Sequence, residues 1–232
     1  MTDASPCVRR TRFAVLLFLM TLTLLYGCVA DRPKTLPADH HASGERAVVA
    51  IFPVGNMVQL YGIHRSVADP ISGDFFMTGE VMENAEDFLA DAVVARLTGH
   101  PRLDLITPKQ VKEALPAFQS AGGGIVKKDQ VIAAGRKMTA DYALVGYVYR
   151  FKQRVGKRYA VETPASAAFG FHLLDLPEGY VIWSGVFNET QQALSEDLLT
   201  LKAFIQRKGR WVTAEDLAQE GLDKIMKDFP LK

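Results

Sequence analysis

Residues 141–151 read DYALVGYVYRF and form the clearest strand pattern in the chain. Valine, tyrosine and phenylalanine are residues that β-strands favour, and they fill most of this run. Three further strand patterns follow, at residues 157–162, 166–175 and 180–190. The last two are joined by residues 177–179 (PEG), which are typical of a tight turn. The carboxyl-terminal half therefore predicts successive antiparallel strands.

Strands and helices alternate ahead of this run. Residues 46–53 (RAVVAIFP) are apolar almost without a break up to the proline, which is typical of a strand buried on both faces. A second short strand is predicted at residues 103–106, and Thr107-Pro108 after it is a helix-start signal. The predicted helices cover residues 84–97, 108–115, 129–138, 195–208 and 213–229. This order predicts an α/β fold, a single layered domain with a mixed β-sheet of about five strands flanked by helices.

The amino-terminal end reads as an export signal. Residues 13–25 carry no charge, but they are fewer than the roughly 20 that a membrane-spanning helix needs. Arginines at 9, 10 and 12 precede them, in the order that a secretory signal peptide has. The sequence predicts a signal peptide at residues 1–27, a flexible tether at 28–45 and a periplasmic α/β domain at 46–232.

The junction Leu25-Tyr-Gly-Cys28 resembles a bacterial lipoprotein box. The resemblance implies cleavage between Gly27 and Cys28 and lipid attachment at Cys28. An uncleaved anchor, or a plain secretory signal with an incidental cysteine, is the alternative. Several acyl chains on one cysteine hold a protein firmly on a membrane. Val29 follows, and not the aspartate of inner-membrane retention, so the expected location is the periplasmic face of the outer membrane.

Composition excludes several classes of function. The chain has 27 Lys and Arg against 26 Asp and Glu; removing residues 1–27, which hold three arginines and Asp3, leaves 24 against 25. A near-neutral domain has no electrostatic footprint for nucleic acid. The histidines show no metal-ligand spacing, and no nucleophile motif is present, so the sequence predicts no catalytic residue, no cofactor and no metal. The chain is expected not to be an enzyme.

Residues 55–83 are the candidate partner-binding segment. Stretches this long without a clear helix or strand pattern are uncommon in compact domains and are often functional. Tyr61, Phe75 and Phe76 lie in it and are the candidate contact residues. The alternative is that these side chains fold back as a lid on the core. Neither the partner protein nor the oligomeric state follows from the sequence.

Four runs carry a family resemblance, and they lie at residues 48–53 (VVAIFP), 103–108 (LDLITP), 140–146 (ADYALVG) and 173–183 (LLDLPEGYVIW). They resemble the periplasmic domain shared by curli-secretion-channel lipoproteins (CsgG-type), penicillin-binding-protein activator lipoproteins (LpoB-type) and the amino-terminal domain of TolB. The resemblance implies a lipid-anchored, non-catalytic binding or assembly accessory protein of the cell envelope. The alternative is a subunit of an outer-membrane secretion pore. Tyr142 and Trp183 are expected as core or edge aromatics, and Gly146 as a position of close approach.

Overall fold

The computed structural model describes residues 46–115, 127–157, 160–191 and 212–231. The predicted signal peptide, lipid site and tether, and the helix expected at 195–208, lie outside these residues. Among the described residues, every helix is too short or too polar to cross a bilayer.

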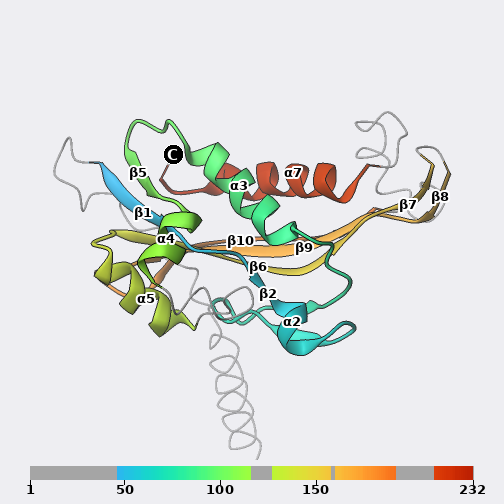
Figure 1. The fold of residues 1–232 in the computed structure, drawn as a ribbon, viewed down its shortest axis with the longest axis horizontal. Helices are drawn as coiled ribbons and strands as arrows, with labels where there is room; N and C mark the ends of the chain where they lie inside the picture. Colours follow the sequence, from blue (N-terminus) through green and yellow to red (C-terminus); the bar gives the residue numbers. More distant parts are fainter. Residues whose placement is uncertain (1–45, 116–126, 158–159, 192–211, 232) are drawn as a thin grey trace, which may run out of the picture. The chain divides into compact units, whose positions relative to one another are not determined.

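One mixed sheet organises the fold, in the order β10-β9-β6-β1-β5 (Figure 1). Strands β5, β1 and β6 run parallel to one another, whereas β6, β9 and β10 are antiparallel. The short β2 pairs in parallel with β6. These strands are β1 (Ala47–Ile51), β2 (Gly55–Asn56), β5 (Leu103–Ile106), β6 (Tyr142–Lys152), β9 (Ser166–Asp175) and β10 (Val181–Thr190). The predicted mixed sheet of about five strands flanked by helices is confirmed.

Helices cover both faces of this sheet (Figure 1). On one face lie α3 (Ala85–Leu97) and α7 (Ala214–Ile225), the latter continued by the short 3-10 helix η4 (Met226–Asp228). On the other lie α2 (Met57–Tyr61), α4 (Pro108–Ala114), α5 (Lys128–Lys137) and a hairpin of β3 (Ser66–Ala68) and β4 (Phe75–Met77). The sheet therefore separates two hydrophobic cores.

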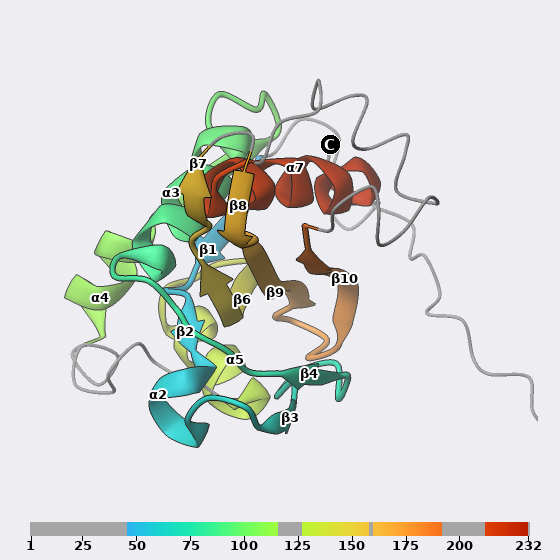
Figure 2. The ribbon, with the colours of Figure 1, turned by 90° about the vertical axis from the view of Figure 1, so that its right-hand side faces the viewer.

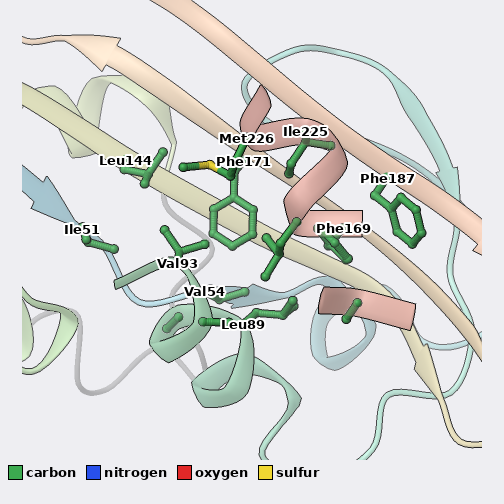
Figure 3. Packing of buried hydrophobic residues seen from close by; sticks show 14 of the residues in the cluster. Ile51, Val54, Leu89, Val93, Leu144, Phe169, Phe171, Phe187, Ile225 and Met226 are labelled. Atoms are coloured by element: carbon green, nitrogen blue, oxygen red, sulfur yellow. The ribbon is translucent and has the colours of Figure 1, made fainter. Parts of the chain in front are cut away.

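Strand β6 contributes to both cores because successive side chains of a strand point to opposite faces. Leu144 and Val148 pack in the core beneath α3 and α7, with Phe169 and Phe171 of β9 (Figure 3). Val145 packs in the core beneath α5 and the hairpin. The continuous apolar pattern of this strand thus reflects burial on both sides.

Gly146 confirms the expected close approach. A Cβ atom built at this position would collide with the ring of Phe171 on the neighbouring strand. The two expected aromatics are also in place: Tyr142 is buried, and Trp183 packs edge-on against Phe229 with 5.1 Å between ring centroids.

Side-chain caps are present at the starts of α4 and α7 but not at that of α3. Thr107 forms a capping box with Gln110, and Thr213 forms one with Asp216. Asn84 precedes α3 as predicted, but its backbone is left-handed (φ 63°) and its side chain makes no cap hydrogen bond. Asparagine tolerates a left-handed backbone better than most residues. Asn84 therefore provides the change of chain direction before α3, but not a side-chain cap.

The single strand predicted at residues 157–162 is wrong in its bounds and in its pairing. The chain forms two short strands there, β7 (Val155–Lys157) and β8 (Ala160–Thr163), which pair only with each other among the described residues. The apolar pattern of a run this short does not distinguish one strand from the two arms of a hairpin.

Candidate functional site

Most of the exposed large apolar side chains gather in one segment. Of the seven in the described residues, five lie between α2 and the end of β4. We call these five the contact surface: Leu60, Tyr61, Ile63, Phe75 and Met77, with exposed fractions between 47% and 74%. Single exposed apolar residues are normal, but their concentration in one segment of a domain is typical of an interaction site.

The β3–β4 hairpin displays part of this surface by strand alternation. Phe76 points inward and is 2% exposed, and its ring stacks on that of Tyr149 with 4.0 Å between centroids. Its cross-strand partner Val67 is also buried. Phe75 and Met77, one residue to either side, must then point away from the sheet.

Helix α2 is held by hydrogen bonds at both of its ends. At its start, Asn56 accepts a hydrogen bond from the Val58 amide and donates one to Glu86 at 2.7 Å. At its end, Gly62 adopts φ 75° and its carbonyl accepts a hydrogen bond from the Thr78 hydroxyl. The segment that follows α2 is therefore bonded to the residue that follows β4.

A polar network that is buried except at Ser184 anchors the hairpin to the sheet. We call it the anchor network: Asp69, Tyr149, His172 and Ser184. Asp69 Oδ2 accepts from the Tyr149 hydroxyl at 2.5 Å and lies 2.9 Å from His172 Nε2. Asp69 Oδ1 accepts from the amides of Ile71 and Ser72, which closes the turn between β3 and β4.

The hydrogen-bonding capacity of each group determines which atoms of the network donate and which accept. An ionised carboxylate only accepts, so His172 Nε2 carries a proton and donates it to Asp69. His172 Nδ1 lies 2.9 Å from the Ser184 hydroxyl, which donates to it when the imidazole is neutral and accepts when it is charged. Every polar group of the network is thus satisfied, as buried polar groups require.

The network holds a carboxylate in its ionised form. Burial by itself raises the pKa of Asp69, but the hydrogen bond and charge of His172, together with the Tyr149 hydrogen bond, outweigh it and lower the pKa to about 2. Burial, together with the negative charge of Asp69, raises the pKa of Tyr149 and of Tyr147 beside it. Both tyrosines therefore remain protonated phenols over the whole physiological range.

This depressed pKa predicts a specific acid sensitivity. The pKa of Asp69 falls from 3.8 to about 2 on folding, so the stabilisation is complete above pH 4 and is lost as the pH drops to 2. It amounts to about 2 kcal/mol. Denaturant unfolding of the wild type and of Asp69→Asn should show a stability gap that narrows by this amount between pH 5 and pH 2. A gap independent of pH would contradict the assignment.

A serine, a histidine and an aspartate joined in this way by hydrogen bonds also occur in enzymes with a serine nucleophile. Here Ser184 lies on an exposed strand face, whereas the described pocket of about 370 Å³ lies elsewhere, lined by residues of α3, α7 and η4. Asp69 also binds two backbone amides and a tyrosine, which ties it to hairpin geometry. We therefore assign the network to anchoring. No group of three or more metal-ligating side chains occurs within the described ranges.

The sequence-predicted site residues separate into three groups. Tyr61 and Phe75 are exposed, whereas Phe76 is buried and belongs to the lid that the alternative described. Gly27 and Cys28 lie outside the described residues. The histidine in strand β9, His172, which had no partner by spacing, has one in Asp69.

Sequence reasoning missed the anchor network. Asp69 is 80 residues from Tyr149 and 103 from His172, so no local spacing connects them. The one local signal is the turn pattern at residues 69–74, where an aspartate before proline accepts amide hydrogen bonds two and three residues on.

No protein-family model and no curated protein matches this chain. Solved structures similar to it include the LpoB carboxyl-terminal domain from Escherichia coli, at TM-score 0.38 and 16% identity over 65% of this chain and 88% of that one. Lipoprotein GNA1162 from Neisseria meningitidis gives TM-score 0.41 and 12% identity over 70% and 97%. The PelC dodecamer from Paraburkholderia phytofirmans gives 0.38 and 16% over 81% and 87%. TM-scores below 0.5 do not assign a function to this chain.

Proposed function

We propose that this chain is a non-catalytic accessory protein of the cell envelope that binds another envelope protein through its contact surface. The observation that carries the proposal is the set of five exposed apolar side chains on a segment fixed from beneath by a buried network. Interfaces draw most of their energy from a few aromatic and aliphatic anchors. A rigid support lowers the ordering cost of binding through them.

The proposed location is the periplasmic face of the outer membrane, with the lipid on Cys28 as the attachment. The support for it is the short apolar run behind three arginines and the Gly27-Cys28 junction. A tether of residues 28–45 would let the domain reach a partner some distance from the membrane surface, since a chain extends by at most about 3.5 Å per residue.

Substitution of the lipid site gives a direct test of this location. Cys28→Ser is expected to leave a precursor that is uncut or a protein released from the membrane, because no thiol remains to be acylated. The measurement is metabolic labelling with a palmitate analogue, followed by membrane fractionation. Cys7→Ser, in the predicted signal peptide, is the matched control and should label as the wild type does. Equal labelling of Cys28→Ser and the wild type would contradict lipidation.

The contact surface is tested by removing its two aromatic anchors. Tyr61→Ser with Phe75→Ser should lower the affinity for the envelope partner by about 2 kcal/mol or more, equivalent to about 30-fold. The full-length tagged protein is cross-linked in its native envelope, and the captured partner is quantified by mass spectrometry. Val155→Ser removes an equally exposed apolar side chain from β7 and should leave capture unchanged. Undiminished capture by the double variant, with its melting temperature intact, would contradict the proposal.

The pore alternative is not favoured. A membrane-crossing strand needs about 9 to 11 residues, whereas β3 and β4 have three residues each. Their inward side chains, Val67 and Phe76, are already buried against the sheet. This hairpin therefore packs against the domain core through its inward side chains.

A further inference from the structure

Strand β10 forms one edge of the sheet and is unusually long for that position. It spans ten residues, Val181–Thr190, and among the described residues it pairs with β9 alone. The pairing with β9 is regular along nearly its whole length, with one irregularity between Val181 and Trp183. The opposite side of the strand therefore presents a row of backbone donors and acceptors to whatever lies beside it.

The sequence of β10 carries little of the protection that edge strands ordinarily have. Exposed edges are usually interrupted by proline, lysine or a central bulge, which prevent pairing with another chain. Residues 181–190 contain neither proline nor lysine. Glu189 is the one charged residue of the strand, and Lys224 of α7 lies 3.0 Å from it. Among the residues that the structure describes, this edge has no strand beside it and is open to an added one.

The exposed face of β10 adjoins the contact surface. Ser184, Val186 and Asn188 are exposed on the face that the hairpin partly covers, whereas Phe187 points to the opposite core. Arg150 connects the two elements, because its guanidinium donates to the Met77 carbonyl at 3.2 Å and to Asn188 Oδ1 at 2.8 Å. Figure 2 shows the β3–β4 hairpin lying below β10.

We propose that the envelope partner binds by adding an extended segment to the edge of β10 that no other described strand pairs with, so that its side chains on one face meet Val186 beside the β3–β4 hairpin. This inference rests on the proposed function and specifies the chemistry of the partner. The row of backbone N–H and C=O groups along β10 favours an extended chain as the partner, because a strand forms hydrogen bonds with all of these groups. On the hairpin side, the side chains of β10 are uncharged, namely Ser184, Val186, Asn188 and Thr190. The charged group beside them, the Arg150 guanidinium, already donates to Ser166 and Asn188. These neighbours favour an uncharged segment that alternates apolar and small polar residues.

Residue-resolved amide exchange separates strand addition from side-chain docking. In an edge strand, every second amide points away from the neighbouring strand. In the free full-length protein, amides of β10 that do not bond to β9 should exchange quickly. In the complex with the captured partner, these alternate amides should slow by about tenfold or more, as new hydrogen bonds of modest strength require. Docking through side chains alone would leave the alternation unchanged.

A charge at the centre of the edge supplies the variant test. Val186→Lys should reduce partner capture by about tenfold or more, because a lysine is a typical block to edge pairing. Val155→Lys places the same charge at another exposed valine, on β7, and should capture as the wild type does. Both variants should keep the wild-type melting temperature, since both side chains are exposed.

The outcomes distinguish this inference from the function on which it rests. Alternate-amide protection together with loss of capture in Val186→Lys supports strand addition. A complex that forms while β10 stays unprotected, or edge amides that are already slow in the free protein, would overturn the inference and leave the proposed function standing. A wild-type chain that captures no partner would overturn both.

Discussion

Replacing Asp69 by alanine is expected to lower the free energy of unfolding by about 3 to 5 kcal/mol, the usual cost of breaking a buried pair from one side. The carboxylate is 3% exposed and receives four hydrogen bonds. Its removal leaves the Tyr149 hydroxyl and His172 Nε2 buried without an acceptor. Unsatisfied buried groups of this kind retain their full desolvation cost. Chemical denaturation at pH 7 measures the change.

Asp74→Ala is the matched control for this experiment. Asp74 belongs to the same turn but its side chain is exposed, so its loss should change stability by no more than about 0.5 kcal/mol. We further expect Asp69→Ala to speed amide exchange in residues 62–78 more than in β6, because the network joins this segment to the sheet. Equal stability of Asp69→Ala and Asp74→Ala would show that the anchor network does not hold the hairpin.

Replacing Leu144 by alanine is expected to cost about 2 to 5 kcal/mol, the range for a fully buried leucine. Leu144 is 0% exposed and lies in the core beneath α3 and α7. Its neighbour Val145 is 1% exposed and lies in the other core, so Val145→Ala should also destabilise, by about 1 to 4 kcal/mol. Thermal and denaturant unfolding measure both changes.

Leu60→Ala is the matched control for the core substitution. The same side chain is removed, but Leu60 is 64% exposed in α2, so the expected change is within about 0.5 kcal/mol. Partner capture should respond in the opposite sense, with Leu60→Ala weakened and the core variants retained as long as they remain folded. Loss of stability in neither core variant would show that β6 is not the central strand.

Local signals were sufficient for much of the fold. The long strands at β6, β9 and β10 and the helix start at Thr107 were predicted within a few residues. These features depend on neighbours in the chain, because caps bond three residues away and strand composition reflects burial on both faces. The same local information was insufficient at residues 157–162, where the run is too short to show whether it turns back on itself.

The candidate contact residues were predicted only in part, because β4 is too short to show which of its side chains face inward. Tyr61 and Phe75 were predicted as contact residues and are exposed, but Phe76 was grouped with them and is buried. In a strand of three residues, the sequence does not show which of two adjacent phenylalanines faces inward. Phe76 is the one that faces inward, because its ring stacks on Tyr149 beneath the hairpin.

The sequence by itself determined the fold class, the central strand and the aromatic character of residues 55–83, because these depend on composition and on periodic burial. Only the tertiary structure decided that Asp69 meets His172 across 103 residues of chain, and that β10 is left at an edge beside the hairpin. Hydrogen bonds between distant residues depend on strand order and register. Both are set by the packing of the two cores as a whole, and not by any spacing along the chain.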